Sequence, residues 1–400
     1  MTLTPEANVL VACARWFVGT ADVGDVYSAA SRVSNWSHLI DTAAWHGVRP
    51  LLYSALDGCD KKPAPAEVVE ELKRQVKAIA HHNLMVTACL REAIDVLDRH
   101  QIRMLTFKGP TLSVAAYGGL ALREFADIDL LIHRNDAAKA LEALTGAGFA
   151  VDSGLHSSLR SRGLLSTESE IVLTHAATGT HVDLHTELLL NYYPFRFPFE
   201  DLWMRRAEQQ LAGRPMAVFS NEDFLLYSCL HGAKHVWSSF GWICDVALLI
   251  NSRGPLEWQA TLALARDRKA THILFSGLLL AADLLKVNNP ESVLSAARAD
   301  PRATSLAAQA ARRLFSRPPG PLPRWESFRY NVQLLNTPRQ KLRYWASNLL
   351  NPTEAEFRAV ALPRPLFFLN YPFRVIRLCG KYLSLGMSSL RRTKQRSTMS

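Results

Sequence analysis

The sequence has no hydrophobic run long enough to cross a bilayer. The 400 residues are 48% hydrophobic, but the apolar stretch Ile273–Leu285 is too short to span a membrane and carries Asp283. The N-terminus contains Glu6 and has no basic stretch ahead of an apolar one, so a secretory signal is not expected. These absences favour a cytoplasmic protein.

Cysteine is scarce, and its spacing is uninformative. The six cysteines are scattered without a C-x-x-C pair, which argues against a zinc ribbon or a disulfide framework. Reduced thiols in a cytoplasmic protein are the simplest expectation. No internal repeat is present. The length and the apolar content predict two or three domains with a large core.

Hydrophobic periodicity predicts the order of several elements. Helical spacing over Asn8–Val18, Trp36–His46 and Ala66–His100 predicts a helical first part of the chain. A helix capped by Asn135 and ending near Gly146 is expected, followed by a strand over Phe149–Val151. Asn221–Ile250 begins with a capping residue and is expected to be an amphipathic helical region.

Acidic residues are absent after Glu356. The basic residues beyond that point are Arg358, Arg364, Arg374, Arg377, Lys381, Arg391, Arg392, Lys394 and Arg396. They account for nearly all of the net charge of +10, so the remainder of the chain is close to neutral. A near-neutral body argues against stable binding of nucleic acid. Aromatic residues among these charges fit contact with a membrane surface or an acidic partner, or else a helix packed on the body.

Two aspartates stand at the start of an apolar strand-like run. Asp127 and Asp129 are one residue apart in Arg123-Glu-Phe-Ala-Asp-Ile-Asp-Leu-Leu-Ile-His133. Alternate side chains of a strand share a face, so the two carboxylates should lie close together. Such a pair suits Mg²⁺ or Mn²⁺, which also bind phosphate. Because D-x-D is common by chance, a charged strand end remains an alternative at this point.

A third carboxylate is predicted beside the pair. Ile171–Thr174 and Thr180–Leu184 read as a hairpin joined by a glycine-containing loop. If its second strand lies beside Ile128–Ile132, Asp183 meets the aspartate pair. His181 and His185 share the face of Asp183 and could line a metal site, with His185 orienting a carboxylate. Glu170 and Glu187 are the next candidates should Asp183 lie elsewhere.

A strand-to-helix turn precedes the aspartates. Ile102–Phe107 reads as a strand, and Lys108-Gly109-Pro110 opens a helix that runs to Tyr117. Free backbone N–H groups at such a helix start bind phosphate, and Lys108 would add a charge for a triphosphate. An ordinary turn with a solvent-facing lysine is the alternative, since the spacing is not that of a Walker motif.

Together the pattern F-K-G-P…Y-G…R…D-I-D-L-L-I…V-D-L-H resembles the nucleotidyltransferase superfamily of DNA polymerase β, and most closely its bacterial branch of uncharacterised nucleotidyltransferases. The resemblance covers roughly residues 30 to 260, although Lys108-Gly109 stands where Gly-Ser is usual. It implies an α+β fold with a small mixed sheet between helical regions. The expected units are a helical region over 1–100, a catalytic domain over 101–216, a helical domain over 217–320 and a basic, aromatic-containing segment over 321–400.

The resemblance also implies a reaction. A nucleoside monophosphate, expected to be AMP, would pass from an NTP to a hydroxyl acceptor such as a sugar, a metabolite or a protein, releasing pyrophosphate. Two Mg²⁺ ions, or Mn²⁺, would be held by the catalytic carboxylates Asp127, Asp129 and Asp183. The nucleotide would be bound by Lys108, Gly109, Arg123 and His185. A metal-dependent hydrolase and a non-catalytic nucleotide-binding or assembly factor stay open as alternatives.

Several further side chains invite a role in this site. Arg123 lies four residues before Asp127 and could pair with it or with phosphate. His231 and His235 are spaced to share a helix face but lack the glutamate of a zinc protease motif. A structural or substrate-cleft role is expected for them, with Asp245 as a hydrogen-bond partner. Trp237 and Trp242 are expected in the core.

Overall fold

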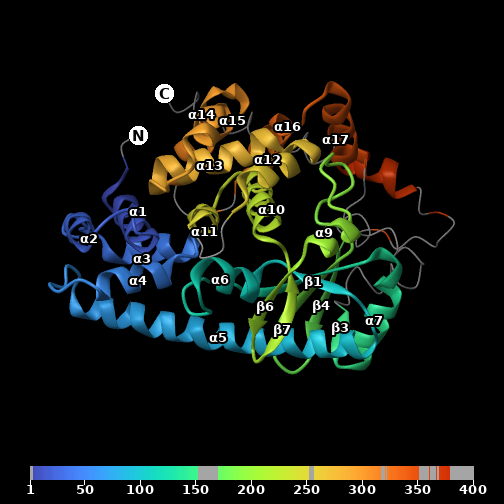
Figure 1. Ribbon diagram of the computed structural model, residues 1–400, viewed down its shortest axis with the longest axis horizontal. Coiled ribbons are helices and arrows are strands. Elements are labelled where there is room, and N and C mark those ends of the chain that lie inside the picture. Colours follow the sequence, from blue (N-terminus) through green and yellow to red (C-terminus); the bar gives the residue numbers. More distant parts are fainter. Residues whose placement is uncertain are drawn as a thin grey trace, which may run out of the picture.

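The chain folds as a mixed β-sheet enclosed by helices (Figure 1). The computed structural model describes residues 3–151, 170–251, 256–316, 320, 322–350, 360, 366 and 369–378. The basic residues beyond 378 and Cys379 lie outside the described residues. In the described part no helix is long and apolar enough to cross a membrane. The five cysteines described there are free thiols and are buried.

Helices are the only regular elements in the described residues 3–100, the first quarter of the chain, as the periodicity predicts. Its elements are α1 (Pro5–Val18), α2 (Val23–Ala30), α3 (Trp36–Trp45), α4 (Arg49–Asp57) and α5 (Ala66–Arg99). The 34 residues of α5 span about 50 Å at 1.5 Å per residue. This helix runs under the sheet, where it contacts β2 (Asp127–Ile132), α6 (Gly109–Tyr117) and α7 (Ala137–Gly146) (Figure 1).

The sheet has seven strands in the order β3-β4-β5-β2-β1-β7-β6. Their bounds are β1 (Met104–Thr106), β2, β3 (Phe149–Val151), β4 (Glu170–His175), β5 (His181–His185), β6 (Ala207–Leu211) and β7 (Arg214–Val218). β2 lies at the centre, antiparallel to β1 and parallel to β5. Its residues after Asp127 are all buried, as expected for a strand covered on both faces.

The predicted hairpin is confirmed. β4 pairs with β5 in antiparallel register, and β5 in turn pairs with β2. Residues of β4 alternate between buried and more exposed positions, with Ile171, Leu173 and His175 buried. That alternation fixes which face each side chain occupies, because a slip of one residue would move the apolar set to the opposite face.

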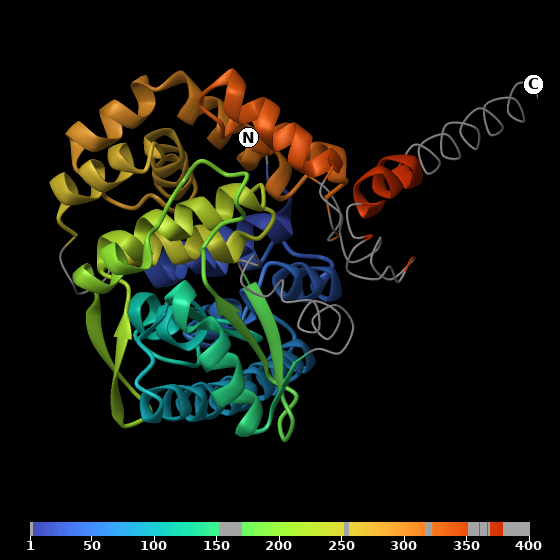
Figure 2. The ribbon, with the colours of Figure 1, turned by 90° about the vertical axis from the view of Figure 1, so that its right-hand side faces the viewer.

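The C-terminal helices form a layer on the other side of the sheet from α5 (Figures 1 and 2). Their bounds are α9 (Phe199–Arg205), α10 (Asn221–Lys234), α11 (Phe240–Ile250), α12 (Trp258–Asp267), α13 (Thr271–Leu285), α14 (Glu291–Ala299), α15 (Pro301–Leu314), α16 (Arg324–Gln333) and α17 (Pro338–Leu350). The apolar stretch noted in the sequence is most of α13, a core helix packed on α10, α11 and α15. The predicted α+β class with helical flanks is thereby confirmed.

Three local features differ from the sequence prediction. Asn135 does not cap the helix after β2, because a 3-10 turn over Arg134–Asp136 precedes α7. α10 is capped one residue earlier than predicted, by the Ser220 hydroxyl, which accepts the N–H of Asp223 at 3.2 Å. The helical region expected over Asn221–Ile250 forms as two helices, α10 and α11, separated where Val236 and Trp237 adopt left-handed φ angles of 59° and 52°.

Candidate active site

The register of β2 and β5 brings the predicted carboxylates together. Asp129 pairs directly with Asp183, and Asp127 pairs with His181. Side chains of paired residues in parallel strands point to the same face, so Asp127, Asp129 and Asp183 share one side of the sheet. Asp129 is buried, whereas Asp127 and Asp183 are partly exposed. The carboxylate cluster predicted from D-x-D and V-D-L-H therefore forms.

Asp129 is the most constrained member of this cluster. Its Oδ1 accepts from Lys108 Nζ at 2.7 Å and is 3.0 Å from His185 Nε2. Its Oδ2 is buried and has no hydrogen-bond partner among the residues that the structure describes. Burial alone would raise the pKa of Asp129, but the charge of Lys108 and the contact with His185 hold it below the ordinary value. Asp129 is thus ionised with one oxygen still available to a ligand.

The other two carboxylates have the opposite tendency. Burial, followed by the nearby charge of Asp129, raises the pKa of Asp127. The same two causes, with Glu170 in addition, raise the pKa of Asp183 to about 7. The negative charges of the three carboxylates repel one another. A divalent cation bound among them would relieve this repulsion, so the cluster favours cation binding.

His185 connects the cluster to Glu170. His185 Nδ1 lies 3.7 Å from Glu170 Oε2, on the side of the ring opposite Asp129. The edge of the imidazole packs against Phe107, with ring centroids 5.4 Å apart. This placement puts His185 beside the Asp129 carboxylate, and its role in orienting that carboxylate stays a prediction. His181 lies on the same face of the sheet, paired with Asp127, but its Nδ1 is 3.2 Å from the hydroxyl of Thr174 on β4.

The turn between β1 and α6 positions Lys108. Gly109 has a φ of +51°, and a Cβ built on it would lie 2.9 Å from the carbonyl oxygen of Asp127. Only glycine can therefore occupy this position without strain. The approach places the start of α6 directly against the start of β2. Burial lowers the pKa of Lys108, but Tyr227 and the carboxylate of Asp129 raise it above the ordinary value, so the ammonium is charged.

Arg123 does not pair with Asp127. Its Nε and Nη2 donate to the two carboxylate oxygens of Asp245 at 2.8 and 3.0 Å, and the hydroxyl of Tyr117 donates to Oδ1 of Asp245 at 2.8 Å. Asp245 is thereby engaged by groups other than His231, its predicted partner. The backbone that carries Arg123 is also fixed, because Nδ2 of the buried Asn83 donates to the carbonyls of Leu120 and Arg123.

One face of α10 lies beside Lys108 and forms one wall of a small cavity. Tyr227 and His231 surround this cavity together with Lys108 and Arg123. Residues four apart share a helix face, so His235 continues this wall by one turn. The ring of His231 lies 4.7 Å from that of His235 and 5.2 Å from that of Trp242. Burial lowers the pKa of both histidines.

Lys234 is a cation that the sequence argument missed. Burial and the charge of Lys108 lower its pKa, while Glu170 and Asp129 act in the opposite direction, so all four groups share one electrostatic environment. Within the described ranges, the Lys234 ammonium makes no hydrogen bond or ion pair. The helical spacing of Tyr227, His231 and Lys234 places them on one face of a helix, and this was the sequence signal that could have identified Lys234. Trp242, expected in the core, is partly buried against the core and also lies against the two histidines of this wall.

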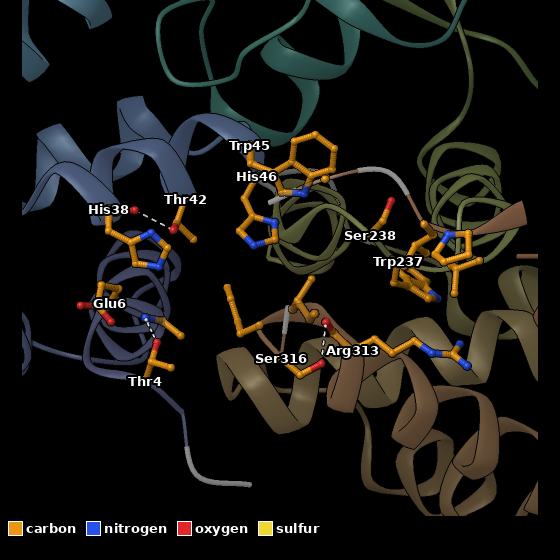
Figure 3. Close-up of a pocket in the computed structure, with 17 residues that line it drawn as sticks. Thr4, Glu6, His38, Thr42, Trp45, His46, Trp237, Ser238, Arg313 and Ser316 are labelled. Atoms are coloured by element: carbon orange, nitrogen blue, oxygen red, sulfur yellow. Dashed lines mark hydrogen bonds between the residues drawn. The ribbon is translucent and has the colours of Figure 1, made fainter. Parts of the chain in front are cut away.

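α11, which carries Trp242 and Asp245, is anchored to the N-terminal helices by His46. Phe240 N–H donates to His46 Nδ1 at 3.1 Å, and Gly241 N–H and the Ser239 hydroxyl donate to the His46 carbonyl. His46 also borders a cavity of about 480 Å³ between the N-terminal helices and the segment after α15 (Figure 3). Trp237 forms part of the wall of this cavity and is fully buried (Figure 3).

The donor set fits a divalent cation. Asp129, Asp183 and His185 each offer a ligand atom, and these atoms lie within 4.8 Å of one another. The buried, unpartnered Oδ2 of Asp129 is the atom expected to be a ligand. Carboxylate oxygens suit Mg²⁺ and Mn²⁺, and an imidazole is better suited to Mn²⁺. Asp127 is not one of these three residues, although it is electrostatically coupled to Asp129.

Comparison with known proteins places the chain in a family. Residues 33–286 match the family described as uncharacterised nucleotidyltransferase, and because the match covers more than half of the sequence, the chain belongs to that family and is a nucleotidyltransferase. No curated protein matches the chain.

Solved structures show only a limited overlap. One is that of the antibiotic-resistance factor ANT(2'')-Ia, with 16% identity and a TM-score of 0.35 over 47% of this chain and 95% of that one. Another is the lincosamide antibiotic adenylyltransferase LnuA bound to lincomycin, with 18% identity and a TM-score of 0.30 over 40% and 93%. A third is an antigenic nucleotidyltransferase-like protein from Paracoccidioides brasiliensis, with 18% identity and a TM-score of 0.30 over 53% and 96%.

Proposed function

We propose that the protein transfers a nucleoside monophosphate, AMP in the simplest case, from an NTP to the hydroxyl group of an acceptor, with release of pyrophosphate. The observation that carries the proposal is the direct pairing of Asp129 with Asp183 across β2 and β5, beside a lysine on a glycine turn. Membership of the nucleotidyltransferase family supplies the reaction class.

The carboxylates and the bound cations would have different roles in the reaction. Asp127, Asp129 and Asp183 would hold two divalent ions, with His185 orienting Asp129. When bound, the ions supply charge stabilisation for the reacting phosphates. Asp183 would accept the proton of the acceptor hydroxyl while that oxygen bonds to the α-phosphorus. The bond between the α-phosphorus and the oxygen bridging to the β-phosphate breaks, and pyrophosphate leaves with its electrons.

The phosphates would be bound from two sides. Lys108 and the α6 N-terminus lie on the sheet side, and Lys234 lies on the helical side of the same electrostatic environment. Lys108 is paired with Asp129 in this structure, so it must exchange at least part of that contact for a phosphate oxygen. Gly109 would let the phosphate approach the backbone closely. Arg123, bound to Asp245, would act on phosphate at longer range.

The test is to follow the label of an NTP carrying ³²P at the α-phosphate. The full chain is incubated with Mg²⁺ or Mn²⁺ and a panel of sugars, aminoglycosides and protein acceptors, and pyrophosphate is measured in parallel. The proposal expects α-label bound to one acceptor and an equal amount of pyrophosphate. Asp129→Asn should abolish both. Glu142→Gln, a change of the same kind at an exposed position of α7, should abolish neither.

Two other outcomes would replace the proposal. Free NMP formed at the same rate with and without any acceptor identifies a hydrolase acting through the same carboxylates. Saturable NTP binding that Asp129→Asn abolishes, with no product under any condition, identifies a nucleotide-binding factor.

A further inference from the structure

Large apolar side chains are exposed most often near the C-terminal end of the described chain. The exposed ones between residues 325 and 376 are Trp325, Leu342, Trp345, Leu350, Leu366, Leu369, Tyr371 and Ile376. Single exposed apolar residues are normal on any protein surface, but a concentration on neighbouring elements marks an interaction surface. Two helices carry most of this one, namely α17 and the helix over 370–378.

The orientation of α17 is fixed by one aromatic side chain. Tyr344 is buried, and its ring centroid lies 5.2 to 5.5 Å from those of Tyr192, Tyr193 and Phe328. With 3.6 residues per turn, Leu342 lies about 160° around the helix from Tyr344 and Trp345 about 100° from it, so the two form one stripe outside this contact. Their exposed fractions are 68% and 53%. The helix therefore buries one aromatic ring and presents a second, apolar face to its surroundings.

Basic residues flank the exposed stripe on both sides. Arg339 and Arg343 lie along one edge of the helix and Lys341 along the other, and all three are exposed. α17 contains no acidic residue, and neither does the helix over 370–378. An apolar stripe with long cationic side chains on both sides is the pattern of a helix that lies in the plane of a membrane interface.

The second helix is joined to the C-terminal end of α17. Arg374 is buried, and its guanidinium donates to the carbonyls of Leu349 and Asn348 at 3.1 and 2.6 Å, which caps the C-terminal end of α17. Tyr371 and Ile376 on this helix are 49% and 68% exposed. Figure 2 shows the helix, drawn in red, standing out from the body beside α17.

We propose that α17 and the helix over 370–378 form a peripheral binding surface for anionic lipid headgroups. Leu342 and Trp345 would enter the boundary between headgroups and acyl chains, and Arg339, Lys341 and Arg343 would contact lipid phosphates. Because neither helix carries an acidic side chain, we expect them to prefer an anionic membrane surface to a neutral one. Since no described helix can span a bilayer, the association is peripheral. This inference is independent of the reaction that the carboxylates perform.

The test uses flotation of the full-length protein with vesicles. One set contains only phosphatidylcholine, and the other contains 30% phosphatidylglycerol. The wild type should float with the anionic vesicles at low salt, and less at high salt. Leu342→Gln with Trp345→Gln should reduce binding at least tenfold. Changing Arg339, Lys341 and Arg343 to glutamine should reduce it roughly 100-fold, from about 1 kcal/mol per basic residue.

A matched control changes exposed apolar residues elsewhere. Leu84 on α5 is 59% exposed and Met204 on α9 is 82% exposed, and Leu84→Gln with Met204→Gln should leave flotation unchanged. All variants should keep the wild-type melting temperature and NTP affinity, since the altered side chains are on the surface. A wild type that does not float with anionic vesicles at low salt overturns the proposal. The proposal is also overturned if flotation is absent and the protein self-associates in a way that the Leu342→Gln, Trp345→Gln variant abolishes. The surface would then be an interface between copies of the chain.

Discussion

Gly109 lies against the backbone of Asp127 so closely that a Cβ on it would be 2.9 Å from the Asp127 carbonyl oxygen. Gly118, at the other end of α6, also has a positive φ but no atom within 4 Å of a built Cβ. Comparing the two glycines therefore distinguishes two reasons why a larger residue would be strained at the ends of α6. Both tolerate φ angles that other residues avoid, and only Gly109 also allows a close approach to β2.

We therefore predict that Gly109→Ala is more harmful than Gly118→Ala. A left-handed φ costs a non-glycine residue about 1–2 kcal/mol, which should be the whole loss in Gly118→Ala. Gly109→Ala adds a clash with β2 backbone that must be relieved by displacing Asp127. Urea unfolding should show the larger loss of stability in Gly109→Ala, and calorimetry should show weaker binding of NTP in that variant alone. Equal effects would mean that the contact with Asp127 has no consequence.

The second prediction concerns the metal. Asp127→Asn and Asp129→Asn should each abolish Mg²⁺-dependent nucleotide binding while the far-ultraviolet circular dichroism stays that of the wild type, because each variant removes a ligand and part of the site's negative charge. Removing the metal with EDTA should lower nucleotide affinity in the wild type and change nothing further in either variant. Unchanged affinity for MgATP in both variants would refute the metal assignment.

Sequence reasoning anticipated this site because its signals are local. The alternation around Asp183 and the apolar run after Asp129 fix which face each carboxylate occupies, and the parallel pairing of β2 with β5 then brings them together. The strand β3 and the helices α5 and α6 were predicted for the same reason, because hydrophobic periodicity and turn residues can be recognised in the sequence itself.

The partner of Arg123 could not be read in this way. Asp245 lies 122 residues further along the chain, and only tertiary packing brings α11 to the loop before β2. The hairpin of β6 and β7 was also missed. Most of β6 is exposed and polar, so its residues carry no apolar alternation. Its turn at Ala212 and Gly213 shows as positive φ angles only in the structure.

The third prediction separates chemistry from binding. Asp183→Ala should keep nucleotide affinity within a few-fold and lose turnover, because Asp183 acts on the acceptor hydroxyl. Lys108→Ala should mainly raise the KM for the nucleotide through a lost phosphate contact. Steady-state kinetics and equilibrium binding on both variants measure the difference. If Asp183→Ala keeps wild-type turnover, the role assigned to Asp183 belongs to another carboxylate, with Glu170 and Glu187 as the next candidates.

The fourth prediction concerns the ion pair of Arg123 and Asp245. Asp245→Asn leaves the Arg123 guanidinium buried beside a neutral amide, and the loss of one partner from such a pair typically costs about 3–5 kcal/mol. The double variant Arg123→Met, Asp245→Leu removes both charges and should be more stable than Asp245→Asn. Urea unfolding of the wild type, Arg123→Met, Asp245→Leu and the double variant gives the coupling free energy. A double variant as unstable as the sum of the two single variants would show that the residues are not coupled.

The last prediction is the acid sensitivity conferred by His46 (Figure 3). Burial lowers its pKa from 6.5 to about 4, and its Nδ1 must stay unprotonated to accept the N–H of Phe240. Between these two pH values the unfolded state binds more protons than the folded state. The stabilisation is therefore complete above pH 6.5 and is lost as the pH falls to 4. At about 1.4 kcal/mol per pKa unit, the loss amounts to roughly 3 kcal/mol.

His46→Asn isolates this contribution, because the asparagine amide oxygen can accept the same N–H without titrating. Urea unfolding at pH 7 and at pH 4 should show a fall in stability for the wild type that exceeds the fall for His46→Asn by roughly 3 kcal/mol. His272, whose pKa is also lowered to about 4, contributes equally to both proteins and cancels in the difference. Identical pH dependence in the two proteins would show that His46 titrates normally and that α11 is not held through its neutral ring.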